Sequence, residues 1–222
     1  QIHRPEADTE IDETLGALTD LVRAGKVRYI GSSTFPASRI VEAQWVAQRR
    51  GRERFVCEQP PYSMLVRAIE SDVLPTCARQ GIGVIPWSPL AGGWLSGRYR
   101  LDGDAPPSTR AERLPARYDL SLPGNQRKLD AADALGVLAE KAGMSLVQMA
   151  IAFATQHPAV TAAIIGPRTM EHLESQLEAS EIELSDDVLD AIDQIVPPGI
   201  TLNPPDNGWE PPSITDPARR RR

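Results

Sequence analysis

Two hydrophobic periods alternate along most of this chain. Short apolar runs with strand-like alternation each end in a polar or glycine-rich turn, and longer stretches follow in which apolar residues recur every three or four positions. This pattern predicts a repeated strand–helix unit. The expected strands cover residues 26–35, 55–59, 81–87 and 160–166, and the expected helices cover 11–24, 37–50, 69–80, 126–142, 146–157, 170–179 and 185–197.

Turn and capping residues indicate where these helices begin and end. Thr9 and Asp12 have the spacing of a capping box before the first helix, and Ser145 and Gln148 have the same spacing before a later one. Gly51 follows the second helix, where a left-handed residue commonly ends the last turn.

Regular alternation of strands and helices favours a parallel sheet with right-handed crossovers. We expect an α/β fold, residues 1–222 forming one domain with the architecture of half a (β/α) barrel, and an open doubly wound sheet is the alternative. No Gly-x-Gly-x-x-Gly follows any strand, which counts against a Rossmann domain. Residues 97–124 are expected to form a polar excursion over a binding face, and residues 198–222 an irregular tail.

The stretch Gly81 to Gly93 is the centre of the pattern. A β-branched apolar run reaches Trp87 and breaks at once into Ser88, Pro89 and paired glycines. This is typical of a buried parallel strand that ends in a ligand-facing loop, the end at which barrel enzymes place their chemistry. A core strand with a tight turn is the alternative for any one such stretch.

Composition narrows the function classes. The 222 residues are 41% hydrophobic and carry a net charge of -6, which gives no general attraction for nucleic acid or acidic membranes. No apolar run is long enough to span a bilayer, and the first residues have neither an initiating Met nor a signal-peptide core, so the chain reads as the middle of a protein. Cys57 and Cys77 are expected to be buried, reduced thiols, which favours the cytoplasm; no metal site is expected.

Five stretches resemble the carboxyl-terminal part of an aldo-keto reductase, in that family's order. They are Ile2-His3-Arg4-Pro5, Gly25 to Phe35, Cys57-Glu58-Gln59, Trp87-Ser88-Pro89-Leu90 and Ile164 to Thr169, and Trp87 to Tyr99 is similar to the branch that includes the potassium-channel beta subunits. The resemblance implies a (β/α)₈ TIM barrel, of which this chain holds the second half, about four strands, plus the tail. It also implies NADP(H) as cofactor and a small carbonyl or alcohol substrate.

The same resemblance implies roles for individual residues. His3 matches the catalytic histidine, although an ordinary hydrogen-bonded histidine is the alternative. Trp87 would stack on the nicotinamide ring. The other implied cofactor contacts are Ser33, Thr34 and Gln59 to the carboxamide; Ser88, Pro89, Leu90, Ala91 and Gly92 to the pyrophosphate; Arg98, Arg110, Gly166 and Arg168 to phosphates; and His172, Ser175 and Gln176 to adenine.

The catalytic Asp, Tyr and Lys of the family have no counterparts at family spacing. Lys128 and Lys141 are expected on an outer helix. Three interpretations therefore remain open: an NADPH-dependent oxidoreductase acting on an aldehyde or ketone, a non-catalytic NADPH-binding or interaction module, and an inactive fragment. A half-barrel is also expected to self-associate or to pair with an amino-terminal half. Trp94 and Trp209 would line the substrate pocket or pack in the core.

Overall fold

The computed structural model describes residues 1–103 and 109–220. Its centre is a parallel sheet in the order β1 (Ile30–Ser32), β2 (Phe55–Glu58), β3 (Gly83–Val84). Single parallel bridges extend it on both sides: Ile2 pairs with Ser32, and Val160 pairs with Val84. The parallel segments thus lie side by side in chain order. That order is the one in a (β/α) barrel, whereas a doubly wound sheet reverses its order at a switch point.

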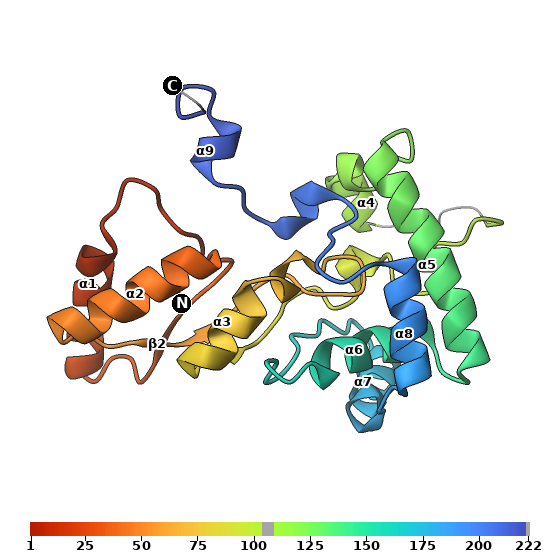
Figure 1. Cartoon of the computed structure of the whole chain (residues 1–222). Coiled ribbons are helices and arrows are strands. Elements are labelled where there is room, and N and C mark those ends of the chain that lie inside the picture. The colour runs from red at the N-terminus through yellow and green to blue at the C-terminus, as the bar shows by residue number, and fades with distance from the viewer. Residues whose placement is uncertain (104–108, 221–222) are drawn as a thin grey trace.

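Helices are the most abundant regular structure in the described chain (Figure 1). They are α1 (Ile11–Arg23), α2 (Ala37–Arg50), α3 (Val73–Gln80), α4 (Thr109–Arg113), α5 (Pro123–Lys141), α6 (Leu146–Gln156), α7 (Met170–Glu178), α8 (Asp186–Ile195) and α9 (Pro212–Thr215). Short 3-10 turns are η1 (Ala68–Glu70), η2 (Ala91–Gly93), η3 (Pro115–Arg117), η4 (Ala179–Glu181) and η5 (Pro204–Asn207). Figure 1 shows α1 and α2 together at one end of the molecule, α3 in the middle, and α5 to α8 at the other end.

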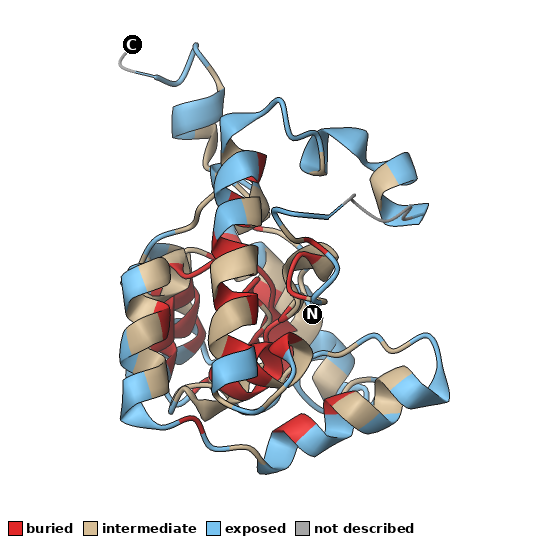
Figure 2. Ribbon diagram, turned by 90° about the vertical axis from the view of Figure 1, so that its right-hand side faces the viewer, coloured by how far each residue is buried: buried red, intermediate tan, exposed pale blue. Residues whose placement is uncertain are grey.

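The core lies between the sheet and these helices, where Figure 2 shows the buried residues. On α2, Ile40, Ala43 and Ala47 are buried, because apolar residues spaced three and four apart share one helix face. Phe55 of β2 meets Phe35 edge to face, with ring centroids 5.9 Å apart. The apolar period read from the sequence therefore identifies the packed face of this helix.

The helix caps give one confirmation and one correction. Ser145 and Gln148 form the expected capping box at the start of α6. The box predicted at Thr9 and Asp12 is wrong: α1 has Glu10 as its N-cap, without a side-chain cap bond. The helix begins one residue later than the Thr9 spacing requires, so the Thr9 hydroxyl is not at the capping position.

Several predicted elements are shorter or more divided than expected. The strand predicted over 26–35 is only three residues long, because the N–H groups of Lys26 and Val27 donate to Leu21 O at the end of α1. The helix predicted over 69–80 is divided into η1 and α3. The tail predicted as irregular includes η5 and α9, and the excursion includes α4 and η3. Residues 104–108 of the excursion and 221–222 of the tail lie outside the described residues.

Across the described ranges, no single helix is both long and apolar enough to span a membrane. The bent pair α5 and α6 passes the same test of length and composition together, with a 94° change of direction between them. Both cysteines are free; Cys77 is buried as expected, and Cys57 is only partly buried.

Candidate functional site

The turn after β1 brings three of the predicted residues together. Ser33 and Thr34 are buried, and the Ser33 hydroxyl donates to the backbone oxygen of Gln59 at 2.8 Å. The Gln59 N–H donates in turn to Ser32 O at 2.9 Å. Thr34 has a φ of 58°, a left-handed conformation that is unfavourable for a β-branched residue. Strained backbone of this kind clusters at functional sites, and here it carries two hydroxyl groups at the carboxyl end of the sheet.

Glu58, which the sequence analysis assigned no role, holds this turn. Its Oε2 accepts from the Ser32 hydroxyl at 2.5 Å, and its Oε1 accepts from the Phe35 N–H at 3.1 Å. The side chain is fully buried, and burial raises the pKa of its carboxyl to about 7, against the lowering effect of these hydrogen bonds. The available signal was an acidic residue at the end of an apolar strand, where an unpaired charge is costly.

Arg4 is a second residue that the sequence analysis missed. Its Nη1 donates to Thr34 Oγ1 at 3.1 Å and lies 3.5 Å from Ser33 Oγ, and its Nε donates to Gly208 O at 3.2 Å. The guanidinium thus donates hydrogen bonds to the hydroxyl groups that, by the family resemblance, would contact the nicotinamide carboxamide. It also joins the beginning of the chain to the carboxyl-terminal tail, a contact that sequence spacing does not reveal.

His3 is placed beside this turn by backbone pairing. The neighbouring Ile2 donates its N–H to Gly31 O at 3.0 Å and pairs in parallel with Ser32. His3 therefore follows an extended residue at the same edge of the sheet as Ser33, and its side chain is exposed. This position is compatible with a group that contacts a substrate at the carboxyl end of the strands.

Residues 87–93, here called the Trp87 loop, lie at the same carboxyl end of the sheet. The Trp87 N–H donates to Pro60 O at 2.9 Å, directly after Gln59 in the chain. Ser88, Ala91 and Gly92 have φ values of 59°, 48° and 72°, so the loop turns sharply after the tryptophan. A cavity of about 260 Å³ lies against it, lined by Trp87, Ser88, Ala91, Gly92, Arg110 and Lys128 among others. Within the loop, Pro89 is buried and Leu90 is partly buried.

Lys128 lies on α5, as part of the predicted helix, but its side chain is buried and does not face solvent. Its Nζ donates to Asp206 Oδ2 at 3.0 Å and to Arg117 O at 3.3 Å, and it sits 4.8 Å from the ring centroid of Trp94. Burial lowers the pKa of its ammonium group. Its partner is 78 residues away in the chain, so local periodicity could not place it. Lys141 is exposed as predicted.

Tyr118 and Arg110 complete the wall of this smaller cavity. The Tyr118 hydroxyl donates to Gly92 O at 2.8 Å, and its ring stacks on Trp94 with centroids 5.6 Å apart. Burial raises the pKa of Tyr118, while the neighbouring Arg110 lowers it. Arg98 is exposed and does not line either described cavity. Of the two arginines predicted to contact phosphate here, the structure brings only Arg110 to the Trp87 loop.

The last predicted group surrounds the start of α7. Ile164 donates its N–H to Pro86 O at 2.8 Å, which holds this segment beside the Trp87 strand. Thr169 caps α7 through its hydroxyl, which accepts from the His172 N–H at 3.2 Å. Gly166 and Arg168 are exposed beside that helix start, and the Ser175 hydroxyl donates to His172 O. Gln176 is buried, and its Oε1 has no hydrogen-bond partner in the described part of the chain.

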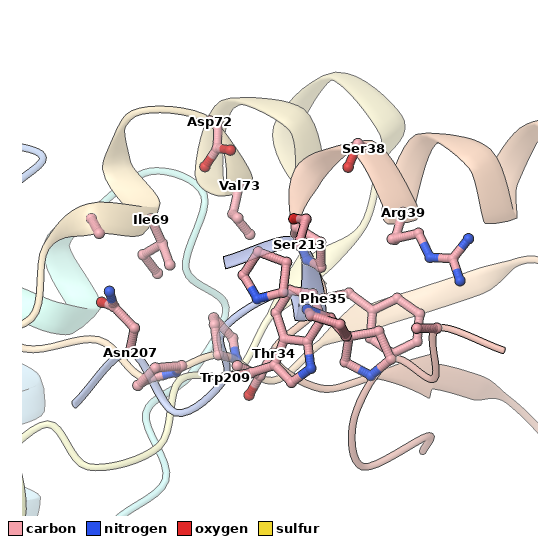
Figure 3. Close-up of a pocket in the computed structure, with 18 of the residues that line it drawn as sticks. Thr34, Phe35, Ser38, Arg39, Ile69, Asp72, Val73, Asn207, Trp209 and Ser213 are labelled. Atoms are coloured by element: carbon pink, nitrogen blue, oxygen red, sulfur yellow. The ribbon is translucent and has the colours of Figure 1, made fainter. Parts of the chain in front are cut away.

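A larger cavity of about 610 Å³ is lined in part by the Thr34 turn (Figure 3). Thr34, Phe35, Ile69, Val73 and Trp209 are among its lining residues, with Arg39 at its margin in the view. Of the two tryptophans left open by the sequence, Trp209 lines this larger cavity. Trp94 is buried in the core and also contributes to the smaller cavity.

The carboxyl-terminal tail forms part of both cavities. Asp206 lines the smaller cavity, and Asn207 lines the larger one. Between them and Trp209, Gly208 has a φ of 78°, and a Cβ at this position would lie only 3.0 Å from Cζ2 of Trp87. Glycine is therefore required here both by the backbone conformation and by the close approach to the indole.

Comparison with known proteins identifies the family of the chain. The aldo/keto reductase family model matches residues 1–197. The chain belongs to the aldo/keto reductase family. That family is a (β/α)₈ barrel, and the three-stranded parallel sheet with its bridged neighbours is consistent with part of such a barrel. The tail residues that contact Arg4 and Trp87 lie beyond the matched region.

Three relatives indicate the range of this family. An uncharacterized oxidoreductase, YrpG of Bacillus subtilis, is 38% identical over 89% of this chain and 57% of its own length. Versiconal hemiacetal acetate reductase of Aspergillus parasiticus is 31% identical over 87% and 55%. A probable voltage-gated potassium channel subunit beta of Arabidopsis thaliana is 33% identical over 87% and 60%. The chain thus spans somewhat more than half the length of these curated relatives.

Proposed function

We propose that this chain binds NADPH and belongs to a cytoplasmic oxidoreductase that interconverts an aldehyde or ketone and its alcohol. The observation that carries the proposal is the hydrogen-bonded connection of Ser33 and Gln59 at the sheet edge that also holds Trp87. Two hydroxyls and an amide can together donate to and accept from a carboxamide, and an indole offers a flat face to an aromatic ring. When bound, the cofactor would supply the hydride.

Basic residues on this edge fit the phosphate groups of a dinucleotide. Arg110 borders the smaller cavity beside the Trp87 loop, and Arg168 stands near the first turn of α7. Helix amino termini and guanidinium groups both favour phosphate, and Arg168 suits either the pyrophosphate or the 2′-phosphate of NADPH. The buried Gln176 oxygen, which has no hydrogen-bond partner among the described residues, is compatible with an additional ligand contact near α7.

Arg4 would need to release Ser33 and Thr34 before a carboxamide could take their hydroxyl groups. His3, exposed beside this turn, would then orient the substrate carbonyl. Two described side chains that could donate a proton near the Trp87 loop are already engaged. Tyr118 already donates to Gly92 O, and Lys128 is held by Asp206.

A second candidate follows from those engaged side chains. A module that binds NADPH without turning it over would need the Trp87 edge but no free Tyr–Lys pair. The likeness to a probable potassium channel subunit beta also supports an interaction role for such a module. An inactive fragment remains the third possibility raised by the sequence, and it predicts no specific cofactor binding.

The deciding experiment is a titration of the purified chain with NADPH and, separately, NADH, followed by tryptophan fluorescence. We expect saturable quenching with preference for NADPH. A Trp87→Phe variant should lose most of the quenching, because Trp87 is the proposed stacking partner. Trp45→Phe is the matched control, since Trp45 is exposed on α2 and should not respond to cofactor.

Turnover separates the two binding candidates. NADPH consumption with 4-nitrobenzaldehyde as the probe substrate would support the oxidoreductase, and cofactor binding without consumption would support the non-catalytic module. Absence of saturable binding to a folded chain would contradict both.

A further inference from the structure

Glu58 is an acid in an unusual place. Its side chain is fully buried, and no salt bridge joins it to a base anywhere in the described chain. An ionised carboxyl without an ion-pair partner is costly to bury, so its hydrogen bonds must offset part of that cost. Both of its oxygens are directed at the turn after β1.

Two hydrogen bonds of Glu58 lie on either side of the strained residues, and the Thr34 N–H between them also favours its ionised form. Ser32, which precedes them, donates its hydroxyl to Oε2, and Phe35, which follows them, donates its N–H to Oε1. Thr34 between these anchors has a left-handed backbone. A strained backbone conformation of this kind persists only when contacts with the surrounding residues hold it in place. Glu58 is thus positioned to fix the hydroxyl groups of Ser33 and Thr34.

The charged and titratable groups around Glu58 are few. Arg4, on the segment before β1, favours the ionised carboxylate. Cys77 faces it from α3; burial first, and then the Glu58 charge, raises the pKa of that thiol to about 12, so it stays neutral. Burial outweighs Arg4 and the hydrogen bonds, which leaves Glu58 titrating near neutral pH.

We propose that Glu58 is a positioning residue of the candidate nicotinamide site, and that its protonation state sets how firmly the 32–35 turn is held for the cofactor. This inference rests on the proposed NADPH binding. The ionised carboxylate accepts from both donors at once. In the protonated form one carboxyl oxygen carries a hydrogen and no longer accepts as a charged group. The hydrogen bonds to Ser32 and Phe35 are then weaker, so the turn is held less firmly. Cofactor should therefore bind more tightly above neutral pH than below it.

The test measures the dissociation constant of NADPH with the full chain from about pH 6 to about pH 8.5. If cofactor binding shifts the Glu58 titration by about half a unit to one unit, linkage requires the affinity to change by about three- to tenfold across this range. Glu58→Gln imitates the neutral acid, because its amide oxygen can accept from Phe35 while its NH₂ donates to Ser32. It should bind as weakly as the wild type does at low pH.

A matched control separates Glu58 from other titrating groups. The 2′-phosphate of NADPH titrates in the same range and contributes equally in every variant, so the difference in slope between wild type and Glu58→Gln isolates Glu58. Glu70→Gln removes another largely buried carboxylate, which bonds to Tyr62 and Arg67 away from the turn. This control should keep the wild-type slope. Equal slopes in wild type and Glu58→Gln would overturn the proposal while leaving NADPH binding intact.

A second measurement needs no cofactor. Hydrogen exchange at the Phe35 amide should be much faster in Glu58→Ala than in wild type, whereas the Ile82 amide, bonded to Cys77 O, should keep its protection. Equal protection of Phe35 in both proteins would overturn the positioning role. If neither protein binds NADPH but only the wild type protects Phe35, the proposed function fails and the role of Glu58 in holding the turn stands.

Discussion

Glu58 also makes folding depend on pH, with a sign opposite to that of most carboxylates. Its pKa is about 7 in the folded chain against 4.5 for the free side chain. The folded state therefore binds the proton more tightly, so the stability from this group is fully present below about pH 4.5 and is lost as the pH rises through about 7. We expect a loss of up to about 3 kcal/mol, measured by urea unfolding between about pH 5 and about pH 8.

Glu58→Gln should remove most of that slope and be more stable than wild type above neutral pH. An unchanged slope in this variant would assign the pH dependence to other groups. Ionised Glu58 accepts well from the donors of the 32–35 turn but is costly to bury. The same ionisation would therefore lower the stability of the folded chain while fixing the conformation of the turn.

Single residues also show what the sequence could and could not predict. The roles of Ser33, Gln59 and Trp87 were predicted from the family resemblance of their stretches, and backbone pairing in the structure brings these residues to one end of the sheet. The contacts of Arg4 and Lys128 were not predicted because their partners, Gly208 and Asp206, lie far away in the chain. Periodicity describes faces of elements, but it carries no information about which distant side chain meets them.

At the scale of elements, the Lys128–Asp206 pair is expected to fasten η5 of the tail to α5. The side chains are 2% and 16% exposed, so removing one charge leaves the other poorly solvated. Asp206→Asn should destabilise the chain by about 3 kcal/mol or more, and the double variant with Lys128→Met should recover part of that loss. Urea unfolding of the four proteins in the cycle measures the coupling.

The Arg219–Asp8 pair provides the control for that cycle. Its side chains are 45% and 80% exposed, so Asp8→Asn should change stability by less than about 1 kcal/mol. A loss from Asp206→Asn no larger than that of Asp8→Asn would show that the tail is held by its other contacts, such as the Leu202 N–H to Leu65 O bond.

Element types were easier to predict than their lengths. The observed bounds of α2 and α6 agree closely with the predicted ones. Each helix has a face of regularly spaced apolar residues, and Gly51 marks the end of α2 while a capping box marks the start of α6. The strands were overestimated at residues 26–29 because the end of α1 takes the N–H groups of Lys26 and Val27. Competition of this kind between neighbouring elements is tertiary, so it does not appear in a local pattern.

At the scale of the whole molecule, some apolar side chains of the sheet region are exposed to solvent. Val56 is 42% exposed although β2 is the central strand, while its neighbour Phe55 is 1% exposed. Ile164, on the segment beside Trp87, is 39% exposed. A closed barrel covers such positions with its remaining strands. In an open sheet they stay exposed, and another chain can bind to them and to the unpaired edge strands.

We therefore expect the chain to self-associate through the surface that includes the exposed side chains of Val56 and Ile164. Sedimentation velocity over a range of concentrations should show dimers or larger species, and Val56→Lys should shift the distribution toward monomer. Val41→Lys is matched to it, because Val41 is 45% exposed but lies on helix α2, and it should leave the distribution unchanged. A wild-type chain that is monomeric throughout and melts cooperatively would contradict this expectation, because its open sheet would then be stable without a partner.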